Sequence, residues 1–317
     1  MKNVFVKKNI FQKFGSLIIL LVLMAIMGIA TPYFFTLSNL LNVGVQASVN
    51  GVLAIGMLIV IIIGGIDLSI GANLALSGIF AAYLMKSGVP IFFALLVSVI
   101  SGLILGFVNG FIVTKMKLPP FITTLGTTGV FRGFALIITN GLPVSQLPSQ
   151  LRVIGQGKLI GIPIPIIITS IVLIIFHIIL NHTTYGRYIF SIGSNYEATR
   201  LSGIRVQKFV IITYMIEGAL AAVGGVILLG RLAVAQPTAA TGYELNAIAA
   251  AVIGGASFAG GSGSVIGAII GALIMAILSN GFTLLGFNAF FQQMAIGFVV
   301  IFAVYADVLQ RGMGDKN

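Results

Sequence analysis

Long apolar stretches separated by short polar connections make up most of the chain. The apolar runs occupy residues 16–36, 44–63, 70–85, 90–114, 120–140, 161–180, 209–230, 244–258, 264–283 and 287–305. A helix needs about 20 apolar residues to cross a bilayer, but runs 70–85 and 244–258 are shorter, and run 120–140 contains Arg132 and several threonines. We therefore predict an all-α integral membrane protein with about ten transmembrane helices, these three lying within the bundle.

The composition leads to the same class of protein. Hydrophobic residues make up 58% of the 317 residues and charged residues only 7%, with a mean hydropathy of +1.15. Soluble domains carry about 25% charged residues, so this chain lacks the polar surface of a water-soluble globule. Cysteine is absent and His177 and His182 are too few for a metal site, which predicts no metal and no disulfide. The first run is too long for the core of a signal peptide and predicts an uncleaved span.

The basic residues are distributed unevenly between the two predicted sides of the membrane. A net charge of +11 in a soluble protein would suggest nucleic acid, but here the basic residues lie in short loops between apolar runs. With ten spans and a cytoplasmic N-terminus, the inside segments hold Lys2, Lys7, Lys8, Lys13, Lys115, Lys117, Arg187, Arg200, Arg205, Lys208, Arg311 and Lys316, and the outside loops hold Lys86, Arg152, Lys158 and Arg231. Since Lys and Arg favour the cytoplasmic side, we predict that both termini are cytoplasmic and that the chain binds no nucleic acid.

Two parts of the chain resemble each other and predict an inverted repeat. The motif Gly-Ile-Asp-Leu-Ser at 65–69 has a counterpart, Gly-Tyr-Glu-Leu-Asn, at 242–246, and Asn-Gly-Phe occurs at both 109–111 and 280–282. Five spans separate equivalent positions, so the copies would have opposite orientations, as in many transporters. Chance similarity between glycine-rich apolar segments is the alternative. The predicted copies are 44–140 and 209–305, within one transmembrane domain, 1–317.

Glycines predict close helix packing but no nucleotide site. Gly102 with Gly106, and Gly267 with Gly271, form pairs that let helix backbones approach in lipid. The glycine-rich stretch 260–264 lacks the lysine of a phosphate-binding loop, and no such motif occurs elsewhere. We therefore predict no cofactor on this chain; if ATP drives transport, ATP and Mg²⁺ bind a partner.

Three acidic residues lie in or beside apolar runs, where an unpaired charge is costly. Asp67 and Glu244 stand where spans begin, so capping of free helix N–H groups is the favoured interpretation and contact with a transported solute the alternative. Glu217 lies well inside its run. We expect it to pair with Arg132, and the alternative is a wet cavity.

Uncharged polar side chains suggest a path for a neutral, hydroxylated solute. They cluster in the first copy and, less densely, in the second, and a charged solute would require compensating charges that the spans lack. The candidates for the translocation path are Gln46, Asn50, Asp67, Asn73, Phe121, Thr123, Thr124, Glu244 and Asn246. Hydrogen bonding between helices is the alternative role for each of them.

The connection 181–208 is the longest one predicted on the cytoplasmic side. Within it, Asn195 is placed to cap a short helix that carries Glu197 in its first turn and Arg200 in its last, and Gly203 is placed to end it. A short capped helix at the membrane face is suited to docking a partner, whereas a solvated connector is the alternative.

The chain resembles permeases of the ribose/xylose/galactose class of ATP-binding-cassette (ABC) importers, within the branched-chain permease superfamily. The resemblance covers about residues 40–310 and rests on the motifs at 64–71, 120–127, 131–133, 193–204, 242–245, 249–255 and 260–263. Any one of these motifs is weak evidence, but together they are specific.

The resemblance implies a permease subunit that forms the path for a monosaccharide and performs no covalent chemistry. Its partners would be a second permease subunit, identical or paralogous, cytoplasmic ATPases that carry ATP and Mg²⁺, and an extracytoplasmic sugar-binding protein, at a bacterial inner membrane. The implied ATPase-coupling residues are Gly193, Asn195, Glu197, Ala198, Arg200, Gly203 and Ile204. The rival interpretation is an ion- or proton-coupled secondary transporter, which the lack of a buried acid relay disfavours.

Overall fold

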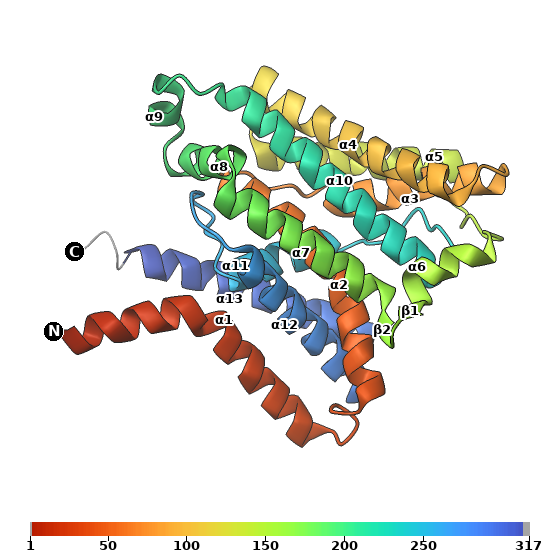
Figure 1. Ribbon diagram of the computed structural model, residues 1–317, viewed down its shortest axis with the longest axis horizontal. Helices are drawn as coiled ribbons and strands as arrows, with labels where there is room; N and C mark the ends of the chain where they lie inside the picture. Colours follow the sequence, from red (N-terminus) through yellow and green to blue (C-terminus); the bar gives the residue numbers. More distant parts are fainter. Residues whose placement is uncertain (1, 313–317) are drawn as a thin grey trace.

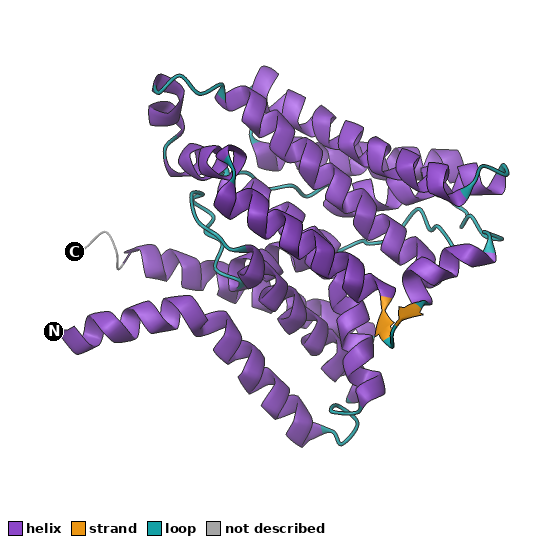
Figure 2. Ribbon diagram, in the orientation of Figure 1, coloured by secondary structure: helices purple, strands orange, loops and turns teal. Residues whose placement is uncertain are grey.

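The computed structural model describes the backbone of residues 2–312 and the side chains of residues 15–305 and Val308. Several basic residues used in the topology prediction, Lys2, Lys7, Lys8, Lys13, Arg311 and Lys316, lie outside the described side chains. The described chain consists of helices joined by loops, with one short β-hairpin (Figure 2).

The helices follow the apolar runs of the sequence. Their bounds are α1 Lys2–Ala30, α2 Leu37–Ile62, α3 Ile70–Lys86, α4 Ile91–Lys115, α5 Pro120–Thr139, α6 Arg152–Gln156, α7 Ile164–His182, α8 Thr184–Ser194, α9 Tyr196–Leu201, α10 Val206–Leu232, α11 Tyr243–Ile253, α12 Val265–Leu284 and α13 Ala289–Gly312. A 3-10 turn, Ser149–Leu151, precedes α6, and strands β1 Lys158–Leu159 and β2 Ile162–Pro163 form an antiparallel hairpin before α7.

Six described helices are long and apolar enough to cross a bilayer: α2, α4, α5, α7, α10 and α12. Four shorter apolar helices account for the remaining runs: Gly15–Ala30 of α1, α3, α11 and Ala289–Tyr305 of α13. The all-α membrane architecture predicted from the sequence is therefore confirmed. The run 120–140, despite its arginine and threonines, forms the full-length helix α5.

Two predicted runs end earlier than the apolar pattern suggests. The helix predicted at 244–258 stops at Ile253, because Gly254 and Gly255, with φ of +94° at Gly255, turn the backbone. At 1.5 Å per residue, α11 extends only about 16 Å, roughly half of the hydrocarbon core. The first run stops at Ala30, and a turn follows in which the Thr36 hydroxyl accepts the Asn39 N–H and caps α2.

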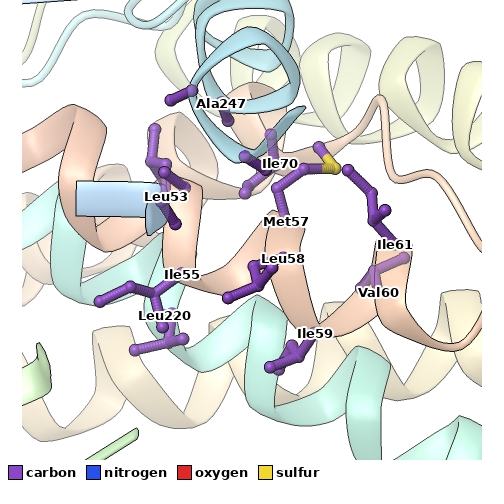
Figure 3. Packing of buried hydrophobic residues seen from close by; sticks show 14 of the residues in the cluster. Leu53, Ile55, Met57, Leu58, Ile59, Val60, Ile61, Ile70, Leu220 and Ala247 are labelled. Atoms are coloured by element: carbon purple, nitrogen blue, oxygen red, sulfur yellow. The ribbon is translucent and has the colours of Figure 1, made fainter. Parts of the chain in front are cut away.

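Helix α2 occupies the centre of the molecule and packs against α10, α11, α12 and α7. Leu53, Ile55 and the stretch 57–62 are fully buried, so the second half of this helix is apolar on every face (Figure 3). A helix that is apolar all round suits a position in the core of a bundle.

Close backbone approach joins α4 to α10. A Cβ placed on Gly102 would overlap the backbone oxygen of Gly218, and one on Gly106 would overlap that of Tyr214. Gly267 and Gly271 of α12 face the backbones of Gly254 and Ala250 in the same way. The close packing predicted from the glycine pairs is therefore confirmed.

Helices α8 and α9 lie at the same end of the molecule as the beginning of α1 and the end of α13 (Figure 1). In Figure 1, the beginning of α1, the end of α13 and helices α8 and α9 share one end, and the β1–β2 hairpin and the α1–α2 turn lie at the other. Helix α9 and the β1–β2 hairpin therefore lie at opposite ends of the bundle (Figure 1).

Candidate functional site

An irregular segment between α2 and α3, residues 63–69, carries a buried carboxylate into the bundle. Asp67 has no exposed surface, and its Oδ1 accepts the Ser69 N–H at 2.6 Å and the Ser69 hydroxyl at 2.7 Å. Its Oδ2 accepts the Asn109 side-chain amide of α4 at 2.9 Å. The N-cap of α3 is therefore Ser69 and not Asp67. Asp67 instead accepts hydrogen bonds that join the segment between α2 and α3 to α4.

Glu217 of α10 lies against Asp67 and is equally buried. Neither of its carboxyl oxygens has a hydrogen-bond partner among the described residues. A buried carboxyl group without a hydrogen-bond partner is costly. Glu217 is therefore held in place by packing, whereas Asp67 is held by hydrogen bonds from Ser69 and Asn109.

The expected pairing of Glu217 with Arg132 is wrong. The Arg132 guanidinium donates instead to the backbone oxygens of Pro237 and Ala239, both at 2.7 Å. The side chain therefore joins α5 to the segment between α10 and α11, far along the chain. The alternative of a wet cavity around Glu217 does not hold either, because the side chain is fully buried.

Glu244 lies in the first turn of α11, close to the position expected for a cap. Its Oε1 accepts the N–H of Gly242, the residue that precedes the helix, at 3.1 Å. Gly242 has a φ of +86°, a backbone conformation that favours glycine. Both acids thus bond the start of the helix that they precede or begin, and Asp67 in addition bonds Asn109 of a neighbouring helix.

The other path candidates fall into three groups. Asn73 and Thr124 are buried and bond neighbouring segments: the Asn73 amide donates to Gly102 O at 3.3 Å and the Thr124 hydroxyl to Ile66 O at 3.2 Å. Side-chain oxygens of Asn50, Thr123 and Asn246 are buried without a partner among the described residues. Gln46 is partly buried and Phe121 is exposed.

Two residues of the polar cluster were missed by sequence reasoning. Ser69 both receives a hydrogen bond from Asn109, at 2.7 Å, and donates to Asp67. Tyr214 is fully buried, and a Cβ on Gly65 would lie 2.8 Å from its hydroxyl. Tyr214 stands three residues before Glu217, on the same helix face, and this spacing is the signal in the sequence that could have identified it.

The short helix predicted within 181–208 is α9, and its local geometry is confirmed. The Asn195 Oδ1 accepts the Ala198 N–H at 2.9 Å, and Glu197 forms an ion pair with Arg200 at 2.8 Å. Gly203 has a φ of +83° and follows the helix end. Ala198 is exposed, so a partner surface has access to it.

The helix before α9 packs directly on the end of α2. A Cβ on Gly193 would overlap the backbone oxygen of Ile62, which also accepts the Gly261 N–H at 2.8 Å. The Tyr185 hydroxyl bonds the Thr213 hydroxyl at 2.9 Å and anchors α8 to α10, and burial raises the pKa of Tyr185 to about 12. Helix α8 thus links α9 directly to the end of α2, where the segment that holds Asp67 begins. No group of three His, Cys, Asp or Glu side chains within the described part of the chain could hold a metal ion.

Comparison with known proteins places this geometry in a family. Residues 39–304 match the family model described as the branched-chain amino acid transport system permease component. The chain belongs to this permease family. No solved structure was found to match it.

Three relatives of this permease illustrate the family. The ribose import permease proteins of Escherichia coli K12 and Bacillus subtilis 168 are 45% and 42% identical to it, over 92% and 94% of both chains respectively. The D-allose transport system permease protein of Escherichia coli K12 is 38% identical over 94% of this chain and 92% of its own. This chain is a permease subunit of an ABC importer, not an enzyme, and ATP hydrolysis belongs to a partner. The rival interpretation as a secondary transporter is set aside.

Proposed function

We propose that this permease carries ribose or a closely related monosaccharide. The observation that carries the proposal is the 45% identity to a ribose import permease over 92% of both chains. The interior fits a neutral, hydroxylated solute, because partnerless amide and hydroxyl oxygens occur at Asn50, Thr123 and Asn246. Asn50 and Asn246 belong to α2 and α11, which pack against each other, so these two are the foremost candidates for contact with the sugar.

We further propose that ten passes form a single membrane domain, 1–317, of two inverted copies. Helix packing supports the symmetry, because the contacts within and between the copies occur in matching pairs. Contacts α3–α4, α3–α5, α3–α10 and α4–α10 have the counterparts α11–α12, α11–α13, α11–α2 and α12–α2. This is the pattern expected when α2 to α5 correspond to α10 to α13.

In the proposed assembly, two such permeases face each other, both termini and α9 lie in the cytoplasm, and α9 docks on an ATPase that binds ATP and Mg²⁺. The capped and ion-paired geometry of α9 supports this role, because force transmission requires a rigid element. An extracytoplasmic binding protein delivers the sugar to the end that holds the β1–β2 hairpin.

Uptake of radiolabelled sugars tests the substrate. The permease is expressed with its ATPase and binding protein in a strain that lacks pentose and allose importers. We expect ATP-dependent uptake of ribose that unlabelled ribose suppresses and unlabelled xylose does not. Uptake of allose or xylose in preference to ribose would contradict the ribose assignment, and uptake abolished by an ionophore with ATP intact would contradict the ATP-driven mechanism.

A further inference from the structure

A cavity of 530 Å³ lies beside α9, the helix proposed above to dock on an ATPase. It is bounded by the end of α4 at Lys115, one side of α9, and the beginning of α10. The lining residues are Lys115, Tyr196, Arg200, Ile204, Arg205, Val206, Gln207, Lys208, Ile211 and Ile212. Its volume is that of a typical ligand site.

The lining combines strong positive charge with an apolar wall. Lys115, Arg205 and Lys208 contribute cations, and of these Lys115 is hydrogen-bonded to the neutral Gln207 at 3.2 Å. Arg200 is already paired with Glu197, and no acidic residue lines the cavity. The cavity is thus built for an anion with an apolar portion.

The face of α9 that lines this cavity differs from the face available to an ATPase. Tyr196 and Arg200, four residues apart, lie on one side of the helix and line the cavity. Ala198 and Leu201 point elsewhere and are exposed, Leu201 by 77%. A docked protein and a ligand in the cavity can therefore occupy α9 together.

We propose that the cavity binds the phosphate headgroup of an anionic phospholipid, with the acyl portion along Ile211 and Ile212. The proposal rests on the cytoplasmic placement of α9 in the proposed function, because basic pockets at the cytoplasmic ends of spans attract anionic lipids. The positive charges of the lining attract a negatively charged headgroup. Because the cavity lies at the ends of α4 and α10, Ile211 and Ile212 lie at the depth of the acyl chains. A bound lipid would brace α9 from its membrane side while the ATPase holds its other face.

Native mass spectrometry of the full-length permease, titrated with phosphatidylglycerol, tests the site. The variant Arg205→Gln/Lys208→Gln should bind the lipid about thirtyfold more weakly than the wild type, on the basis of about 1 kcal/mol for each basic residue. The charge-matched control Lys117→Gln/Arg187→Gln removes two exposed cations that do not line the cavity, and its affinity should be unchanged. Lys208→Gln alone should weaken binding about fivefold and provides the test if the double variant fails to fold.

Three results would overturn the proposal: equal affinity of the cavity variant and the control, equal binding of phosphatidylcholine, and displacement of the lipid by an equal concentration of inorganic phosphate. The last would indicate a site for free phosphate. Sugar uptake is not measured in this experiment, so failure of the lipid site and failure of the transport function are separate outcomes.

Discussion

At the scale of single residues, two buried acids differ in how they are held. Asp67 accepts hydrogen bonds from Ser69 and Asn109, whereas neither carboxyl oxygen of Glu217 has a hydrogen-bond partner among the described residues. An unpaired buried donor or acceptor costs about 1–3 kcal/mol. The two positions should therefore respond differently to replacement by an amide.

We predict that Glu217→Gln is tolerated and that Asp67→Asn is not. Neither carboxyl oxygen of Glu217 has a partner to lose among the described residues, and glutamine has nearly the same shape, so the free energy of unfolding should stay within about 1 kcal/mol of the wild type. Asparagine at 67 would turn an amide group toward the donors on Ser69 or Asn109 and lose about 1–3 kcal/mol. Thermal unfolding in detergent measures both, with Glu197→Gln on the surface as control. Equal destabilisation by the two variants would contradict the difference in hydrogen bonding between the two acids.

At the scale of elements, the pairing of α4 with α10 depends on the absence of side chains. Gly102 and Gly106 lie against backbone of α10, so the helices approach more closely than a Cβ permits. Most association energy between helices in lipid comes from such packing. The junction also carries Asn109 and Glu217, so its spacing sets the geometry of the acid cluster.

Gly106→Ala should therefore destabilise the permease by about 2 kcal/mol or more, because the new methyl group overlaps the Tyr214 carbonyl and the helices must separate. The matched control is Gly297→Ala in α13, where no atom lies within 4 Å of the added Cβ. This control should be neutral or slightly stabilising, since alanine favours helix. The test is a comparison of the melting temperatures of the two variants. Similar values would show that α4 and α10 can separate enough to accept the methyl group without loss of stability.

The second element with a testable role is α9. Ala198→Trp adds bulk to its exposed face, and Gly203→Pro replaces a residue whose φ of +83° proline cannot adopt. We expect both variants to insert into the membrane but to lose ATPase on co-purification and to lose sugar-stimulated ATP hydrolysis. Lys158→Trp, on the exposed hairpin at the other end, is the control. If Ala198→Trp keeps ATPase and stimulation, coupling through 193–204 must be abandoned.

At the scale of the whole molecule, the two ends of the bundle should face different compartments. Single cysteines introduced into this cysteine-free chain at Lys86 or Lys158 should react with an impermeant maleimide added outside. A cysteine at Arg200 should react only after the membrane is opened, because the positive-inside rule places that loop in the cytoplasm. Labelling of the Arg200 position from outside would reverse the proposed orientation.

The sequence by itself determined the features that depend on local interactions. The apolar runs predict the helices because burial in a bilayer requires about 20 apolar residues whatever their neighbours are. The capped helix α9 was predicted in detail because Asn195, Glu197, Arg200 and Gly203 act within one turn or two of the chain. The family motifs likewise led to the permease function.

The tertiary structure alone decided the partners of the buried polar groups. Asp67 meets Asn109 and Glu217, and Arg132 meets the backbone near residue 238, all far apart along the chain. The apolar pattern of the sequence indicates that such polar groups are buried. It does not indicate their partners, because many residues of suitable charge or polarity could form a hydrogen bond with each one. Only the packing of α4, α10 and the 63–69 segment, set by glycines in close backbone contact, selects among them.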